Sequence, residues 1–473
     1  MKKIVLLFSW LVASIQISSA QKEAWNWNFG INAGLKFDST LTPTAITTSA
    51  MTNFEGVASI SDRDGKLLFY TNGTNVYNAL NEQMPNGFGL LGHASSTQSS
   101  IIVRKPLSDS LYYIFTVDYL SGSNGLQYST VDMTLDGGKG DLSSKNNVLL
   151  ANSREKVTAI RHANGIDFWI LVIDWQTDDL YAYLVNHTGV SAIPVVSPMD
   201  MLQMGITNPG INRSNGYMKA NLQGNRIAMG LWAAYSFDLF DFDNATGIVS
   251  NHIKIQGNAT TMGPTYGVEF SPDGSKLYGT TMSAPFKLIQ FDLNSNNGDT
   301  LFAKRTILKS EPNSLCNNYY YGALQLGPNG KIYSTTECDT FLNVISQPDS
   351  LGQACNFQPR SIPLAGRECK LGLPNFIADM SILTPTKIIL QSAEQFLPLL
   401  YPNPTNGNLT LSFNSKSEER VTFILTDVFG RERQKQEDVF DGQRLKIDLP
   451  NGIYYATLSN GKLYKTSRIV FQK

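Results

Sequence analysis

The sequence predicts an all-β protein, and three observations lead to this prediction. A β-hairpin pattern recurs along most of the 473 residues. Hydrophobic residues make up 42% of the chain and charged residues 16%, a composition typical of folded, sheet-rich proteins. The last stretch carries short amphipathic strands at a different spacing. Because the chain is too long for one ordinary core, we expect a repeat architecture followed by a separate module.

The clearest hairpin covers residues 266–279. Val268 and Phe270 would point to one side of a strand, and Leu277 restarts the alternation after the turn residues Pro272–Gly274. Hairpins of the same kind, mostly followed by a further apolar run, occupy residues 55–70, 100–115, 156–171, 217–231 and 322–334. A period of roughly 50 residues with four short strands per unit is typical of a β-propeller.

The two ends of this repeat array are incomplete, and they complement each other. Residues 25–29, 33–37 and 44–47 form three strands without a first strand, whereas residues 373–383 form a first strand without partners. Joined in one sheet, they complete a seventh blade and remove the exposed edges of an open array. We therefore predict a seven-bladed propeller over residues 21–385, with six and eight blades as the alternatives.

Two of the hairpins resemble a known family. FSPDGSKLY (270–278) and LGPNGKIY (326–333) are similar to the strand-turn-strand motif of lactonase-like and YVTN-type seven-bladed propellers. The resemblance implies the architecture and says little about function. The Gly-His to Trp-Asp pairing of WD40 blades, the kelch glycine pairs and the sialidase Asp-box are not found in the sequence.

The first 20 residues read as a secretory signal peptide. Lys2 and Lys3 precede an apolar run, and the small residues Ser18 and Ala20 stand at positions −3 and −1 before Gln21. A membrane anchor, the alternative, would need roughly 20 apolar residues, and polar residues interrupt this run. We expect cleavage between Ala20 and Gln21, export to the periplasm, and no transmembrane span in the mature chain.

The C-terminal residues 401–473 predict a small Ig-like β-sandwich after a linker at 386–400, because apolar and polar residues alternate in strands every 10 to 15 residues. This block resembles the type A C-terminal sorting domain of the type IX secretion system, found in Bacteroidetes-type secreted proteins. The matching residues are Tyr401, Pro402, Asn403 and Pro404, the segment 427–431, Gly452 and Tyr454, and the basic end at Lys473. The resemblance implies type IX machinery as partner and a secreted or cell-surface protein. An ordinary adhesive sandwich is the alternative.

Four cysteines lie in one region: Cys316, Cys338, Cys355 and Cys369. Export permits disulfides, and three pairings are possible. A hairpin that turns at residues 327–330 would bring Cys338 within a few residues of Cys316, so we predict the pairs Cys316–Cys338 and Cys355–Cys369. A zinc site is the alternative, although the chain has no CxxC pair.

The charge balance excludes one class of partner. The chain has 38 basic and 39 acidic residues, a net charge of −1, so it lacks the basic excess that nucleic-acid binding needs.

Three glutamates are candidate metal ligands. Glu55 and Glu155 stand just ahead of first strands, and Glu269 lies within one. Convergent carboxylates could hold Ca²⁺, with Asn72 and Asn75 assisting, and the lactonase-like resemblance implies such a site. Solvated or hydrogen-bonded strand-end residues are the alternative.

The remaining candidate residues indicate binding more than catalysis. Trp175, Tyr319, Tyr320 and Tyr321 could stack on a sugar or a peptide, and His162 lies in a predicted turn. No catalytic frame surrounds any histidine, so we name no catalytic residue. We predict a glycan- or protein-binding module, more plausibly without enzyme activity. The alternatives are a calcium-dependent propeller hydrolase, lactonase or glycan-cleaving, and a structural component of a surface or motility apparatus.

Overall fold

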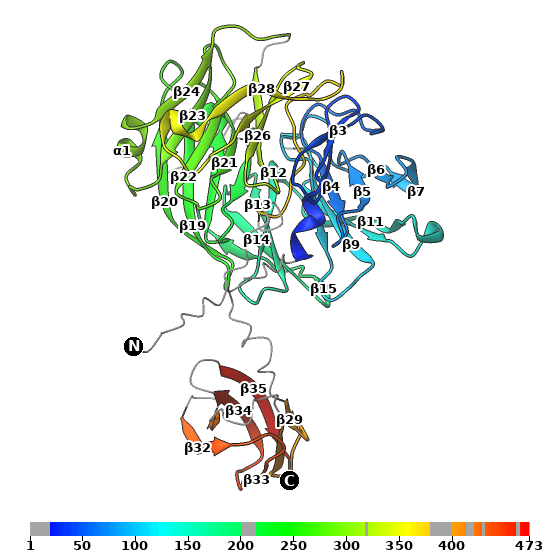
Figure 1. The fold of residues 1–473 in the computed structure, drawn as a ribbon, viewed down its shortest axis with the longest axis vertical. Helices are drawn as coiled ribbons and strands as arrows, with labels where there is room; N and C mark the ends of the chain where they lie inside the picture. Colours follow the sequence, from blue (N-terminus) through cyan, green and yellow to red (C-terminus); the bar gives the residue numbers. More distant parts are fainter. Residues whose placement is uncertain are drawn as a thin grey trace, which may run out of the picture. The chain divides into compact units, whose positions relative to one another are not determined.

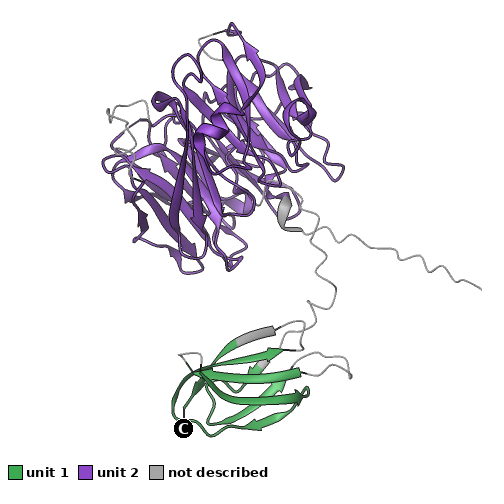
Figure 2. Ribbon diagram, turned by 90° about the vertical axis from the view of Figure 1, so that its left-hand side faces the viewer, with its two compact units in different colours: residues 1–16, 384–473 green, residues 17–383 purple. Residues whose placement is uncertain are grey.

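The structure is a computed structural model, and it describes residues 19–120, 122–199, 214–316, 320–378, 399–412, 421–427, 431–459 and 464–472. The chain divides into two compact units, one covering residues 17–383 and the other containing residues 384–473 (Figure 2). The signal-peptide prediction for residues 1–20 falls almost wholly outside the described residues.

The described part of the larger unit contains seven antiparallel sheets, which we number in chain order (Figure 1). Sheets 1 to 3 comprise β1 (Asn26–Phe29), β2 (Ala33–Lys36) and β3 (Thr44–Ile46); β4 (Ala58–Ser61), β5 (Leu67–Thr71), β6 (Asn75–Asn78) and β7 (Gln83–Phe88); and β8 (Ser100–Arg104), β9 (Leu111–Val117), β10 (Leu126–Asp132) and β11 (Asp141–Leu150).

Sheets 4 and 5 comprise β12 (Ser153–Arg161), β13 (Phe168–Asp174), β14 (Leu180–Asn186), β15 (Gly189–Val190) and β16 (Val195–Ser197); and β17 (Met218–Ala220), β18 (Arg226–Leu231), β19 (Ser236–Asp243) and β20 (Ile248–Gln256). Sheets 6 and 7 comprise β21 (Thr265–Phe270), β22 (Lys276–Thr281), β23 (Phe286–Asp292) and β24 (Thr306–Glu311); and β25 (Tyr321–Leu326), β26 (Ile332–Thr336), β27 (Phe341–Ile345) and β28 (Phe357–Pro363). The helix α1 (Gly298–Ala303) precedes β24.

The sheets succeed one another through their first strands. β4 contacts β8, β8 contacts β12, β12 contacts β17, β17 contacts β21, and β21 contacts β25. Every residue of β21 and β25 is buried, as expected for strands covered on both faces. The predicted glycines occupy the hairpin turns, where Gly274 and Gly330 adopt φ values of 74° and 73° that favour glycine. This succession of antiparallel sheets is a β-propeller fold.

Residues 371–377 form an axial segment that contacts first strands of several sheets. Leu371 donates its N–H to Phe54 O (2.9 Å) and accepts from Ala323 N (2.7 Å). Asn375 donates its backbone N–H to Val57 O (2.8 Å) and its Nδ2 to Val157 O (2.8 Å). All seven residues are buried. The segment therefore lies against the first strands of sheets 4 and 7 and the residues that lead into the first strand of sheet 2.

This geometry corrects the prediction of a first strand at residues 373–383. Residues 373–378 form no strand and make only a single parallel bridge, between Pro374 and Val57; residues 379–383 lie outside the described residues. The physical reason is close backbone approach. A Cβ on Gly372 would stand 1.7 Å from Glu55 O, so its backbone lies directly against the end of sheet 2 instead of joining sheet 1.

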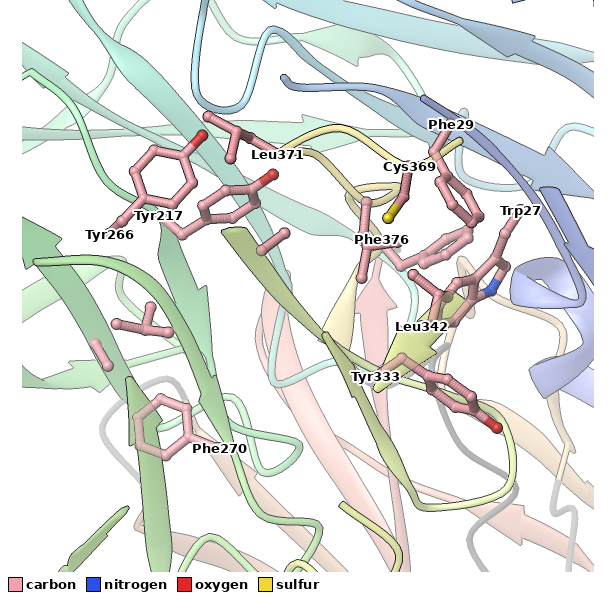
Figure 3. Packing of buried hydrophobic residues seen from close by; sticks show 14 of the residues in the cluster. Trp27, Phe29, Tyr217, Tyr266, Phe270, Tyr333, Leu342, Cys369, Leu371 and Phe376 are labelled. Carbon is pink, nitrogen blue, oxygen red and sulfur yellow. The ribbon is translucent and has the colours of Figure 1, made fainter. Parts of the chain in front are cut away.

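Aromatic residues connect the two ends of the larger unit. The ring of Trp27 lies 5.9 Å from that of Phe376 and 5.3 Å from that of Tyr333 (Figure 3). Ile31 N donates to Glu368 O at 2.8 Å. Sheet 1, sheet 7 and the axial segment thus share one hydrophobic core.

The smaller unit is all-β as well. One sheet contains β29 (Leu399–Tyr401), β30 (Asn408–Ser412) and β33 (Arg444–Lys446). The other contains β31 (Val421–Asp427), β32 (Glu432–Val439), β34 (Gly452–Ser459) and β35 (Tyr464–Phe471). The predicted alternation is confirmed where it is described, since Leu409, Leu411, Val421, Phe423 and Leu425 are buried in a common core.

The cysteine prediction is half right. Cys316 and Cys338 form a disulfide, whereas Cys355 and Cys369 are free and buried, so the predicted pair Cys355–Cys369 is wrong. The two thiols lie in different cores, because Cys355 packs beside β28 with Tyr278 and Cys369 packs with the axial segment. Among the described residues, no helix is long and apolar enough to cross a membrane.

Candidate functional site

Two of the predicted glutamates converge at the inner ends of the first strands. Thr97 Oγ1 donates to Glu155 Oε1 at 2.7 Å, and Leu120 N donates to Glu155 Oε2 at 2.9 Å. The side chains of Thr97 and Tyr266 also interact with the Glu55 carboxyl. Tyr217 packs on Tyr266 with ring centroids 5.5 Å apart (Figure 3). We call Glu55, Glu155, Thr97, Tyr217 and Tyr266 the carboxyl cluster.

The carboxyl cluster holds buried acid groups close together. Burial raises the pKa of Glu55 well above its usual value, and the neighbouring Glu155 and Glu337 carboxyls raise it further. Burial raises the pKa of Glu155 to about 7. A shared proton or a bound cation would relieve this repulsion.

Unsatisfied oxygen atoms in the carboxyl cluster bear on the predicted Ca²⁺ site. Within the described residues, Glu55 Oε2, Tyr217 Oη and Tyr266 Oη are buried and make no hydrogen bond of good geometry, although the Tyr266 hydroxyl lies near the Glu55 carboxyl. Buried polar atoms of this kind require an explanation, such as an ion or a water. The oxygen-only donors suit Ca²⁺, and Glu55, Glu155 and Thr97 are the residues that would hold it.

The third predicted glutamate lies elsewhere. Glu269 Oε2 is 3.9 Å from Lys219 Nζ, and its carboxylate accepts from the N–H groups of Phe270 and Leu326, both at 3.0 Å. Burial raises the pKa of Glu269 and lowers that of Lys219. A cavity of about 10 Å³ beside this pair has room for one water. The structure therefore does not bring Glu269 to the carboxyl cluster.

The two predicted assisting asparagines stabilise a turn instead. Asn72 Oδ1 accepts from Thr74 N (3.1 Å) and Asn75 N (2.8 Å), so its side chain is already engaged between β5 and β6. Asn75 Nδ2 donates to Thr74 Oγ1 at 3.1 Å.

Sequence reasoning missed several residues around the carboxyl cluster. Thr97 belongs to the polar run 95–100, of which residues 96–100 are fully buried, and a polar run leading into a first strand is the signal that could have marked it. Lys156 is also buried, donates to Gly230 O at 2.9 Å, and has its pKa lowered to about 7 by burial. The charge of Lys156 beside Glu155 lowers the pKa of that carboxyl and so partly offsets the effect of burial.

A second candidate site is an open groove beside the hairpin turns of sheets 4, 5 and 6. Its larger lobe has a volume of about 1050 Å³ and its smaller lobe about 230 Å³, and both lobes are lined by Asn221 and Gln223 of the β17–β18 turn. We call it the turn-face groove. Its other polar lining residues are Asn225, Arg226, Asp241, Asp243, Ser250, Asn251, His252, Asp273 and Asn296 in the larger lobe, and Arg161, His162 and Asn244 in the smaller.

Hydrogen bonds hold the groove side chains in place. Asn251 Nδ2 donates to Asp241 Oδ2 at 2.9 Å, and Arg226 Nη2 donates to Asn296 Oδ1 at 3.2 Å. His252 Nε2 lies 2.7 Å from Asp238 Oδ2, a carboxylate that is completely buried. The polar surface of the groove is therefore preorganised, which lowers the entropic cost of binding.

The other predicted binding residues are dispersed. His162 lines the smaller lobe of the groove, where Asn164 N donates to its Nδ1 at 3.0 Å. Trp175 is half-buried, with the guanidinium carbon of Arg154 4.9 Å from its ring centroid. Tyr321 is buried in the core, and Tyr320 is partly buried and stacks on Phe286. Tyr319 lies outside the described residues.

Predicted sorting residues lie in the smaller unit. Asn403 Oδ1 accepts from Val470 N at 2.9 Å and its Nδ2 donates to Arg468 O at 2.7 Å, so the loop after β29 is attached to β35. Tyr454 contacts Phe471 with ring centroids 5.1 Å apart. Tyr401 is exposed, Gly452 begins β34, and Lys473 lies outside the described residues.

Several solved structures resemble this chain in a structural comparison. A protein assigned as a 6-phosphogluconolactonase, from Bacteroides uniformis, is 13% identical over 68% of this chain and 92% of its own, with a TM-score of 0.42. A Lactobacillus plantarum protein is 11% identical over 74% and 98%, with a TM-score of 0.46. The Cps50 (Swd1) β-propeller domain of Myceliophteria thermophila is 10% identical over 66% and 94%, with a TM-score of 0.38. No curated protein shows significant sequence similarity to the chain.

A family model identifies the smaller unit. Residues 399–472 match the secretion system C-terminal sorting domain. Such a tail implies export by the type IX machinery to the cell surface or the medium. The C-terminal unit of this chain is therefore a type IX secretion system sorting domain.

Proposed function

We propose that this protein is an exported seven-bladed β-propeller that binds a glycan or protein ligand in the turn-face groove. The seven sheets would be the seven blades, and the axial segment would complete the closure between sheets 7 and 1. The contacts of Trp27 with Phe376 and of Ile31 with Glu368 support this closure. The C-terminal sandwich would be Ig-like, with a cleaved signal peptide at residues 1–20 and a linker at 386–400.

The observation that carries the binding function is the turn-face groove itself. It is open, larger than 1000 Å³ in its main lobe, and lined by polar side chains fixed by hydrogen bonds. The carboxyls of Glu55 and Glu155, in contrast, are buried. The geometry therefore favours binding over hydrolysis.

Binding is tested with the full-length chain and isolated cell-envelope material. We expect the chain to co-sediment with this material, and Arg226→Ala together with Gln223→Ala to abolish the co-sedimentation. Equal co-sedimentation of the double variant would contradict a binding role for the groove.

Export is tested by truncating the chain after Thr384. The truncated protein should accumulate in the periplasm, since it lacks the sorting domain. Normal appearance at the surface or in the medium would contradict the export route.

A calcium site in the carboxyl cluster is a second candidate function. The buried oxygens of Glu55, Tyr217 and Tyr266, which make no hydrogen bond of good geometry, favour it. Added Ca²⁺ should raise the melting temperature of the chain, and Glu55→Ala should remove this rise. An unchanged melting temperature at millimolar Ca²⁺ would contradict the calcium site and indicate that Glu55 and Glu155 share a proton instead.

A further inference from the structure

We infer that the turn-face groove recognises a neutral glycan and not a protein or a polyanion, an inference that rests on the proposed binding function. Three properties of the groove lead to this ligand class: the chemistry of its side chains, its charge balance, and the few apolar side chains of its larger lobe.

Amides are the commonest polar side chains of the described lining. Six amide side chains line the two lobes: Asn221, Gln223, Asn225, Asn244, Asn251 and Asn296. An amide offers a carbonyl acceptor and an NH₂ donor side by side. Adjacent hydroxyl groups on a pyranose ring present the same combination at similar spacing, so planar amides suit sugars better than they suit a charged ligand.

The charges of the groove nearly cancel. The guanidinium groups of Arg226 and Arg161 are opposed by the carboxylates of Asp241, Asp243 and Asp273. Arg226 Nε lies 3.7 Å from Asp241 Oδ1, so this guanidinium is already partly neutralised. A polyanion needs a positive surface, and a groove with more carboxylates than guanidiniums does not provide one.

The larger lobe lacks the apolar anchors of a protein interface. Among the described residues, only Phe242 and Ile253 contribute large apolar side chains to it, and Phe242 is 3% exposed. Protein interfaces take most of their binding energy from a few aromatic or arginine anchors in desolvated pockets. The larger lobe exposes no aromatic anchor among the described residues, and Arg226, its one arginine, is already paired with Asp241, so a ligand there would be held mainly by hydrogen bonds.

The dimensions indicate an oligosaccharide and not a single sugar. The groove runs beside three hairpin turns, at residues 162–167, 221–225 and 271–275, and its larger lobe alone reaches about 1050 Å³. Pockets for drug-sized ligands measure about 300 to 1000 Å³. The groove therefore has room for several linked sugar units.

The test is affinity electrophoresis of the full-length chain in native gels that contain mannan, laminarin, xylan or dextran, with alginate as the polyanion. We expect at least one neutral polysaccharide to retard the chain and alginate not to. Gln223→Ala and Asn296→Ala should each weaken retardation about tenfold, the effect of one lost hydrogen bond. Gln176→Ala is the matched control, because Gln176 is equally exposed but lies at the β13–β14 turn, outside the groove.

A photo-crosslinking residue at position 223 separates failure of the glycan class from failure of binding. Crosslinking to an envelope protein, with no retardation by any neutral polysaccharide, would overturn the glycan class and leave the groove as a binding site. Retardation that is equal in Gln223→Ala, Asn296→Ala and the parent chain would also overturn the inference. If the chain shows no crosslinking and no retardation, both this inference and the proposed function are overturned.

Discussion

The carboxyl cluster with its axial segment and the turn-face groove contain similar residue types, yet they differ in burial. Glu55, Glu155 and Asn375 are buried between first strands, whereas Gln223 and Asn296 line an open groove. A buried polar group costs stability unless it is paired, and an exposed one costs almost nothing. The comparison indicates that the polar residues of the carboxyl cluster and the axial segment stabilise the fold. The polar residues of the turn-face groove are instead open to a ligand.

Substitution of Lys219 should have the largest effect on stability. Lys219→Met removes the cation 3.9 Å from Glu269 and leaves that carboxyl buried without a counter-charge. We expect a loss of about 4 kcal/mol in the free energy of unfolding. Five of the six tryptophans lie in the larger unit and none lies in residues 384–473, so tryptophan fluorescence in urea reports mainly on the larger unit. Lys304→Met, at an exposed position, is the control, and recovery in the double variant Lys219→Met/Glu269→Gln would confirm the pair.

Substitution of Asn375 should have the next largest effect. Asn375 Nδ2 donates to Val157 O and Ser100 O, and its Oδ1 accepts from Gln98 Nε2 at 3.2 Å. Asn375→Leu leaves these buried groups unpaired, at a cost of about 3 kcal/mol. The same urea titration measures it, and a loss as small as that of the exposed control Asn294→Leu would show that the axial segment does not hold the sheets together.

The axial segment also shows what the sequence could not predict. Leu371, Leu373 and Ile377 are spaced like the inward residues of a strand. An apolar pattern predicts burial, but it does not show which groups the backbone will bond. The repeat was predictable for the opposite reason, since each hairpin contains its own turn residues, such as Asp273 and Gly274. Pairing within a unit is local, whereas the path of residues 371–377 depends on five different sheets.

The candidate site residues also differ in how far the sequence could predict their positions. Glu55 and Glu155 occupy similar places before or at the start of their first strands, and they converge. Glu269 is the fifth residue of β21 and lies farther along the strand, so it faces Lys219 instead. The turn-face groove was not predictable, because three turns that are distant in sequence must first be placed side by side.

The pH dependence of stability should show a smaller effect than these substitutions. Burial raises the pKa of Glu155 from 4.5 to about 7, so the folded chain binds a proton that the unfolded chain releases. The stability contributed by this proton is complete below pH 4.5 and is lost as the pH rises through 7. We expect a decrease of about 2 kcal/mol between pH 5 and pH 7. The raised pKa of Glu55 acts in the same direction. The lowered pKa of Lys156, about 7, acts in the opposite direction, and most of its effect falls above pH 7.

Glu155→Gln provides the check on this pH effect. The variant keeps the shape of the side chain and cannot ionise, so its urea midpoint should change less between pH 5 and pH 7 than that of the parent. Glu82→Gln, at a partly exposed position, should leave the pH profile unchanged. A parent chain that becomes more stable over this range would show that a cation, and not a proton, compensates the carboxyl cluster.

The smallest effect on stability is expected in the turn-face groove. Gln223 is exposed, and no hydrogen bond from its side chain is found among the described contacts, so Gln223→Ala should change the free energy of unfolding by less than about 0.5 kcal/mol. The same variant is expected to lose about tenfold in polysaccharide binding. Measured together, the two values separate a binding residue from a structural one. A large loss of stability in Gln223→Ala would show that the groove residues, like those of the axial segment, are needed for folding.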